Sequence, residues 1–178
     1  MNPSPLHGIR NGVLLLAACS TLLSTAAAQS PAPCASVSAE FDFWIGDWTA
    51  RWTGPDQREL EGRNRVRRAL DGCVIMEEFD GTPGSPLKGI SISVYDPKRK
   101  VWKQTWVDNQ AGYLDFEGGF ADGRMVLARS TEVNGKPVRQ RMVFHGITRD
   151  AFTWDWQRSR DDGKSWETTW QIRYTRSR

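Results

Sequence analysis

Histidine, cysteine and long apolar runs are scarce in this chain. Its 2 His and 3 Cys among 178 residues form no cluster of the kind that binds zinc. The sequence also lacks a Gly-x-Ser-x-Gly motif and a phosphate-binding loop, so a hydrolase triad and a nucleotide-binding fold have no support. A formal net charge of +3 is too balanced to indicate nucleic acid or an anionic membrane as a partner.

The longest apolar run, Gly12–Leu23, lies near the N-terminus and is too short for a membrane-spanning helix. It follows Arg10 and precedes the small residues Ala26-Ala27-Ala28, a pattern typical of a cleaved signal peptide. We therefore expect residues 1–28 to be removed near Ala28 on export of the protein to the periplasm or beyond. Only Arg10 is lost among the charged residues, which leaves a mature charge of about +2.

The cysteines have different expected fates. Leu16-Ala17-Ala18-Cys19 fits a bacterial lipobox, so a lipid anchor at Cys19 is the alternative to soluble export. The two cysteines of the mature chain, Cys34 and Cys73, predict one disulfide in an exported protein, closing a loop of about 40 residues. The alternative is a pair of buried free thiols.

Residues 29–38, with Pro31 and Pro33, predict a linker arm, and residues 39–178 predict the folded domain. Ser38 is placed to cap a short helix over about Ala39–Ile45. After Gly46 the apolar pattern changes to a period of two, which indicates β-strands. The predicted strands are Trp48–Trp52, Gly62–Ala69, Cys73–Phe79, Gly89–Tyr95, Val101–Val107, Tyr113–Gly118, Arg124–Glu132, Val138–Ile147, Phe152–Arg158 and Trp166–Thr175.

Tight turns separate these strands, and Asn134-Gly135 is the strongest hairpin signal because both central residues of a type I′ turn favour positive φ. About ten short strands without an intervening long helix predict one antiparallel, up-and-down sheet. Closure into an all-β barrel removes the long open edges of such a sheet, with the short helix closing one end.

Tryptophan is the enriched residue, with 9 copies, all between Trp44 and Trp170. Several strands carry an aromatic and polar face, which is typical of a lumen that holds water or ligand. The residues that we expect to line the lumen or its core, with Gln104 and Asp108 as polar contacts, are Trp102, Gln104, Trp106, Asp108, Trp154, Trp156 and Trp170. The sequence alone does not tell which strand face points inward.

Several motifs together resemble a family of small exported bacterial proteins of unknown function. They are Phe41-Asp-Phe-Trp-Ile-Gly-Asp-Trp48, Gly62-Arg-Asn-Arg65, Asp71-Gly-Cys73, Gln104-Thr-Trp-Val-Asp-Asn109, Asp122-Gly-Arg-Met-Val-Leu127 and Gly163-Lys-Ser-Trp166. The resemblance covers essentially the whole mature chain and implies a lipocalin-like (calycin) barrel, without site residues to transfer.

Lipocalin-like barrels have a Gly-x-Trp motif whose Trp plugs one end, beneath an Arg from the last strand. By this resemblance Gly46 and Trp48 are structural, and Arg173 or Arg176 covers the indole, a contact worth about 0.5–2 kcal/mol. Nitrobindin-type barrels, which bind haem through one His, are similar in size. Haem binding through His145 is therefore an alternative, although the repeated Gly pattern expected after Trp48 is missing.

Other polar residues have mainly structural interpretations. Two of the strand acids Glu77, Glu78, Asp80, Asp108, Asp115, Glu117 and Asp155 would form an acid/base pair if they met in a lumen, but solvated acids are the simpler expectation. Ser159–Trp166 matches a single Asp-box, which predicts a hairpin. Asp42 and Asp47 are expected to cap the helix or a turn, and the alternative is that they bind a ligand at the barrel end. The arginines of Arg63–Arg68 are expected to face solvent, or to form an anion-binding wall if they point inward.

The sequence thus favours a non-enzymatic barrel that binds a small apolar or amphipathic ligand. The alternatives are an enzyme that uses lumen carboxylates on a small polar substrate, and a structural envelope protein without a ligand. No metal site and no nucleic-acid partner are expected.

Overall fold

The computed structural model describes Met1 and residues 39–177. A 3₁₀ helix, η1 (Ala39–Trp44), is followed by ten β-strands. The strands are β1 (Gly46–Thr53), β2 (Glu59–Ala69), β3 (Val74–Asp80), β4 (Lys88–Asp96), β5 (Val101–Asp108), β6 (Tyr113–Ala121), β7 (Arg124–Val133), β8 (Lys136–His145), β9 (Ala151–Ser159) and β10 (Glu167–Arg176). Every predicted strand is confirmed, with ends shifted by a few residues.

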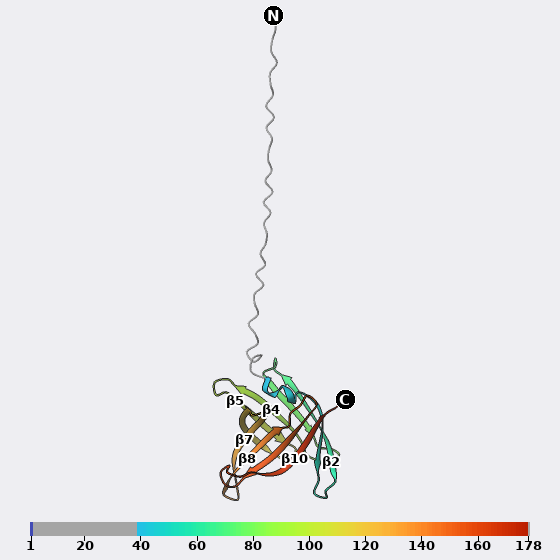
Figure 1. Cartoon of the computed structure of the whole chain (residues 1–178), viewed down its shortest axis with the longest axis vertical. Helices are drawn as coiled ribbons and strands as arrows, with labels where there is room; N and C mark the ends of the chain where they lie inside the picture. The colour runs from blue at the N-terminus through green and yellow to red at the C-terminus, as the bar shows by residue number, and fades with distance from the viewer. Residues whose placement is uncertain (2–38, 178) are drawn as a thin grey trace. The chain divides into compact units, whose positions relative to one another are not determined.

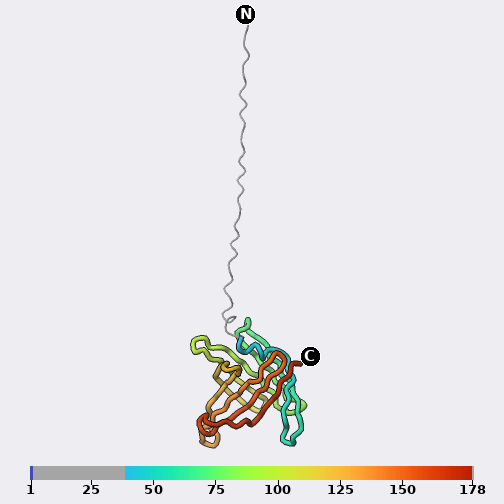
Figure 2. The backbone as a smooth tube through the Cα atoms, viewed as in Figure 1, coloured from blue at the N-terminus to red at the C-terminus, as the bar shows by residue number. Residues whose placement is uncertain are grey.

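The strands form one closed antiparallel barrel, in which each strand pairs with its neighbours in sequence and β1 closes the ring against β10 (Figure 1). The chain therefore runs up and down around the wall, as the smooth backbone trace shows (Figure 2). The predicted all-β, up-and-down barrel is confirmed. Closure satisfies the backbone hydrogen bonds that an open sheet would leave at its two edges.

Turn chemistry explains why the strands reverse where they do. Asn134 and Gly135, between β7 and β8, have φ of 53° and 71°, as the predicted type I′ turn requires. Asp122 and Gly123, between β6 and β7, have nearly the same values, 51° and 71°. Two-residue turns of this kind match the right-handed twist of the strands that they join.

The period of two separates the inside of the barrel from the outside. In β2, Asn64 and Val66 are buried, whereas the alternating Arg63, Arg65 and Arg67 are exposed. Arg65 donates to Asp47 at 2.8 Å and Arg67 pairs with Glu78. The arginine face of β2 is therefore the solvated outer wall, and the inward anion-binding alternative is wrong.

η1 closes one end of the barrel. Phe41 and Trp44 are 0% and 2% exposed, and their spacing of three places them on the same side of a helix with three residues per turn. The predicted helix is thus a short 3₁₀ segment that ends at Trp44. Asp42 pairs with Arg68 of β2, and Asp47 with Arg65, so neither carboxylate caps the helix.

Trp48 is covered by the end of β10. Its indole nitrogen donates to the Trp44 carbonyl at 2.8 Å, and the guanidinium carbon of Arg176 lies 4.2 Å from its ring centre. Arg173 is therefore not the residue that shields Trp48, because its side chain points outward and donates to Glu59 at 2.7 Å. Alternation along β10 explains the correction: Arg176 shares the inward side with Ile172 and Tyr174.

The signal peptide (residues 1–28), the linker arm (residues 29–38), Cys19, Cys34 and the capping Ser38 lie outside the described residues. The Cys34–Cys73 disulfide, the lipid anchor and the domain boundary at residue 38 thus stay predictions. Among the described residues, no helix combines the length and apolar character that a membrane crossing requires.

Candidate functional site: an aromatic lumen with one buried carboxylate

The lumen contains a cavity of about 250 Å³. Side chains from most strands and from η1 form its wall, and more than half of them are aromatic. The wall consists of Trp44, Glu77, Phe79, Leu87, Gln104, Trp106, Asp108, Leu114, Phe116, Met142, Phe144, Trp154, Trp156, Trp170, Ile172 and Tyr174. A pocket with an apolar body and a few polar groups is the usual form of a small-molecule site.

The aromatic rings of the wall hold one another in fixed orientations. Trp154 and Trp156 are stacked, with ring centres 6.2 Å apart, and Trp170 stands edge-on to Trp154 at 5.5 Å. Phe79 meets Trp170 at 86°. Because these residues come from β3, β9 and β10, the rings brace opposite parts of the wall and keep the cavity open.

The position of the Trp106 ring depends on Gly89 of the neighbouring strand β4. A Cβ atom added at Gly89 would lie 2.2 Å from the Trp106 ring, so only glycine lets the indole lie flat over β4. The indole nitrogen then donates to the Asp108 carboxylate at 2.9 Å. Gly89 therefore fixes both the ring and its polar partner at the end of β5.

Glu77 is a buried carboxylate in this apolar wall, with 7% of its surface exposed. One carboxylate oxygen accepts from Asn64 Nδ2 at 2.8 Å, and the other accepts from Ser91 Oγ at 2.7 Å. Burial raises the pKa of Glu77 to about 7, against the smaller, opposite effect of these two hydrogen bonds. Glu77 therefore changes its charge near neutral pH.

Asp108 has the opposite electrostatic character. It accepts hydrogen bonds from Trp106 Nε1 and from the backbone N–H groups of Gln110 and Gly112, each at 2.9 Å. These donors, led by the Trp106 indole, lower the pKa of Asp108, so its carboxylate is ionised at neutral pH. The cavity wall thus combines one acid that titrates near pH 7 with one that stays charged.

Polar atoms at the closed end of the lumen have unused hydrogen-bonding capacity. Trp44 is 2% exposed, and its indole N–H is buried without a partner among the described residues. The side-chain oxygen of Asn64 is in the same state. A buried donor without a partner costs free energy of about 1–3 kcal/mol. Both atoms are fully buried, so they are covered by neighbouring side chains and not exposed to the cavity.

All of the lumen residues predicted from the sequence, except Trp102, line this cavity. Trp102 is inward but lies at the plugged end, where it packs edge-on against Phe41 and donates to Glu40 at 3.0 Å. Trp102 therefore belongs to the core, which is one of the two places predicted for it, because its height in the barrel puts it under η1. Whether the remaining residues bind a ligand stays a prediction.

Sequence reasoning did not single out Glu77 as a site residue, nor Trp44, Asn64, Ser91 and Tyr174. One signal was present for Glu77: it alternates with Ile75 and Phe79, both of which are buried. An acid at the centre of an apolar strand face indicates a buried carboxylate. Trp44 gave no such signal, because its position depends on how η1 folds across the barrel end.

Of the strand acids considered for a pair, only Glu77 and Asp108 line the cavity. Asp155 lies on the outer face of β9, where it accepts from Gln171 at 2.8 Å and lies 3.1 Å from His145 Nε2. His145 alternates with Phe144, which faces the lumen. An axial bond from His145 to haem inside the lumen is therefore not supported by its placement.

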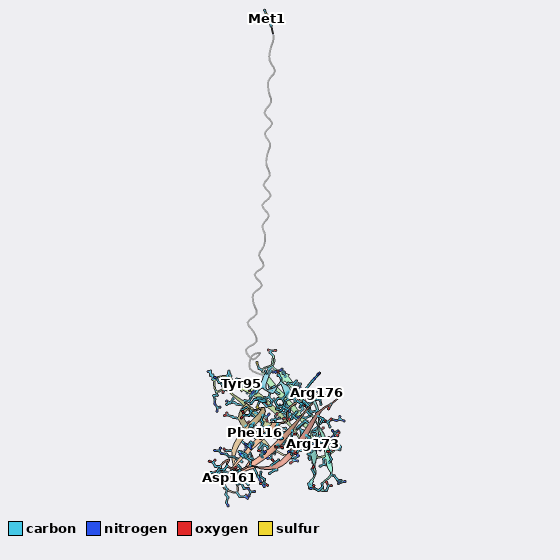
Figure 3. All side chains as sticks on the ribbon, in the orientation of Figure 1. Met1, Tyr95, Phe116, Asp161, Arg173 and Arg176 are labelled. Carbon is cyan, nitrogen blue, oxygen red and sulfur yellow. The ribbon has the colours of Figure 1, made fainter. Side chains whose placement is uncertain are left out.

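The Asp-box folds as the predicted hairpin, between β9 and β10. Asp161 accepts from the Ser165 backbone N–H at 2.9 Å, Gly163 has a φ of 89°, and the Trp166 indole donates to the Gly163 carbonyl at 3.1 Å. Arg141 covers the Trp166 ring at 3.8 Å. In Figure 3 Asp161 lies at the opposite end of the barrel from Arg176. The motif is structural.

No group of three or more potential metal ligands is present among Met1 and residues 39–177. Comparison with curated proteins gives no match. Residues 41–176 match the model of a family described as a protein of unknown function, DUF1579. The match spans the whole barrel, from the plug to Arg176.

Proposed function

The chain belongs to the DUF1579 family, a membership that assigns no activity, so we propose from the geometry of the lumen that the protein binds a small ligand. The observation that carries this proposal is the cavity of about 250 Å³, whose wall is mostly aromatic. An apolar or amphipathic molecule gains from burial against the rings, at about 25 cal/mol per Å² of apolar surface.

The closed, up-and-down wall and the contact of Arg176 with Trp48 support a lipocalin-like mode of binding, with the ligand inside the barrel. The opposite end, where Trp106, Asp108 and Leu114 line the cavity, is the proposed entrance, since η1 closes the other. Binding takes place, in this proposal, after export and removal of residues 1–28.

Native mass spectrometry of the exported, purified protein tests this proposal directly. We expect a bound species that is released on denaturation, together with an N-terminus near Gln29. An N-terminal lipidated Cys19 would instead support the lipoprotein alternative. A ligand-free mass at every stage of purification would favour the structural envelope protein.

Two variants of β6 provide a matched comparison. Leu114 lines the cavity, whereas the adjacent Tyr113 is 66% exposed on the outer wall. We expect Leu114→Trp to fill the lumen and abolish the bound mass, and Tyr113→Trp to leave it unchanged. Equal occupancy in both variants would place the ligand outside the lumen and contradict the proposal.

One observation favours an enzyme as the second candidate. The pKa of Glu77 is raised to about 7, and the pKa of Asp108 is lowered, in the same cavity. Such a separation suits a general acid and a permanently charged carboxylate. Turnover of a panel of glycosides and esters that disappears in Glu77→Gln would support this candidate, and its absence would leave binding as the function.

A further inference from the structure

The charged groups in the cavity wall all have the same sign. Glu77 and Asp108 line it, and no Lys, Arg or His is among the described residues of the wall. A ligand that displaces water from this cavity would meet the field of these charges with little screening. The lumen is therefore electrostatically suited to a cation and opposed to an anion.

The rings of the wall reinforce this preference. The face of an indole or phenyl ring is negative and its edge positive, and a cation over the face is attracted by about 0.5–2 kcal/mol. Trp154 and Trp170 are nearly perpendicular, at 87°, and Phe79 is at 86° to Trp170. Perpendicular rings direct their negative faces in different directions. An aromatic cage uses such an arrangement to surround an ammonium group on several sides.

Glu77 lacks the cationic partner that buried carboxylates usually have. Its two oxygens accept only from the neutral groups of Asn64 and Ser91, and Glu77 forms no ion pair among the described residues. Each oxygen of Glu77 therefore accepts one hydrogen bond and has a lone pair to spare. A buried charge without a partner is expensive.

We propose that the lumen selects an organic cation, an amine or quaternary ammonium group on an apolar body, with its positive charge held between Glu77 and the indole faces. This inference rests on the proposed binding function and names the ligand class. The apolar body fills the cavity beside the aromatic wall. The ammonium group supplies the positive charge that Glu77 lacks.

The groups around Glu77 agree with this assignment. Asn64 of β2 and Ser91 of β4 flank it in neutral hydrogen bonds. Tyr174 of β10 is buried, and desolvation, aided by the charge of Glu77, raises its pKa, so it stays neutral. Asp108 of β5 is the other charge in the wall. A bound cation would favour the ionised form of Glu77 and bring its pKa below 7.

Arg129 is the residue that competes with this inference. It shares the inward side of β7 with Leu127, and its NH1 atom is buried without a partner among the described residues. Its guanidinium carbon lies 5.8 Å from the centre of the Phe116 ring, and Arg129 itself does not line the cavity. An anionic probe in the experiment below measures its influence.

The experiment uses three probes that share a benzyl body: benzyltrimethylammonium, its neutral isostere 2,2-dimethylpropylbenzene, and phenylmethanesulfonate. Tryptophan fluorescence and thermal shift report binding to the mature protein. At pH 8 we expect the cation to bind about tenfold more tightly than the neutral isostere, and the sulfonate to bind least. Glu77→Gln should reduce the preference for the cation to about twofold or less.

The matched control is Glu132→Gln, which removes the same charge from an exposed position of β7. It should leave the preference intact. A second measurement needs no variant: with a Glu77 pKa of about 7, affinity of the wild-type protein for the cation should rise about tenfold from pH 6 to pH 8. Affinity for the neutral isostere should not rise.

Equal or tighter binding of the isostere or the sulfonate would overturn the inference, as would a cation preference that survives in Glu77→Gln. Such results leave ligand binding itself intact. If none of the three probes binds and native mass spectrometry finds another class of ligand, only the cation assignment fails. If none binds and the exported protein carries no ligand, the proposed function fails with it.

Discussion

The guanidinium carbon of Arg176 lies 4.2 Å from the centre of the Trp48 ring, and its NH1 donates to the Ile45 carbonyl at 3.1 Å. One side chain from the last strand thus ties together the first strand and the segment that enters it. The same guanidinium donates to the Arg149 carbonyl at 2.9 Å. Arg176 accordingly links three segments at the closed end of the barrel, through its contacts with Trp48, Ile45 and Arg149.

Replacing Arg176 should therefore destabilise the barrel. We expect Arg176→Gln to lower the free energy of unfolding by about 1–3 kcal/mol, through loss of the ring contact and of the charged hydrogen bonds. Urea unfolding measures the change. Arg173→Gln, which breaks only the exposed pair with Glu59, is the control and should cost less than about 1 kcal/mol. Equal losses would mean that the Trp48 contact is not important.

Gly46 should tolerate substitution poorly, because two constraints meet there. Its φ is +139°, and an added Cβ would lie 2.2 Å from Arg176 NH1. Gly123 has a φ of +71° and open space around it, so it carries only the conformational constraint. We expect Gly46→Ala to reduce stability by about 2–3 kcal/mol and Gly123→Ala by about 1 kcal/mol. The reverse order in thermal unfolding would contradict the packing argument.

The raised pKa of Glu77 predicts that the free energy of unfolding depends on pH. Its pKa rises from 4.5 to about 7 in the folded protein. Between these values the unfolded chain has released a proton that the folded chain retains, so this residue makes the protein less stable as pH rises through the window. Below pH 4.5 the effect is absent, and above pH 7 it is constant.

Glu77→Gln removes this effect. Relative to wild type, the variant should gain about 3 kcal/mol in unfolding free energy between pH 4.5 and pH 8, as measured by urea unfolding at both values. Glu132→Gln should show no comparable gain. A constant difference between Glu77→Gln and wild type across this range would mean that folding does not raise the pKa of Glu77.

Asp108 should make the stability of the protein depend on pH in the opposite direction to Glu77. Its lowered pKa means that the stabilisation is present above the unfolded pKa of about 4 and is lost as pH falls through the folded value. Asp108→Ala leaves three donors without their acceptor, and we expect a loss of about 1–3 kcal/mol at pH 7. Asp115→Ala, which removes one exposed bond to Thr105, should cost less than about 1 kcal/mol.

The strands and turns were predictable because they follow from local rules. Alternation of apolar residues and turn pairs such as Asn134-Gly135 act within a few residues, and closure follows from the number of strands. The direction of each face was not predictable, since a period of two is symmetric between in and out. This symmetry explains why Arg173 was as plausible as Arg176 until the wall was closed.

The candidate site was only partly predictable, for a related reason. The alternation placed Trp106 with Asp108, and Trp154 with Trp156, on a common strand face, and these faces line the cavity. The height of a residue in the barrel depends on the stagger of all the strands, so the sequence did not tell that Trp102 belongs to the core under the plug and Trp106 to the cavity wall. The position of Glu77 beside Asn64 and Ser91 is set by pairing across three strands.

The strand order also determines when the fold becomes complete. Each strand from β2 to β10 pairs with the strand that immediately precedes it in sequence. The second partner of β1 is β10, which lies more than a hundred residues later. A chain emerging N-terminus first therefore builds a growing sheet with two unpaired edges. Trp48 is unshielded until Arg176 reaches it, so the pairing of β10 with β1 ends the interval in which open sheet edges expose the protein to aggregation.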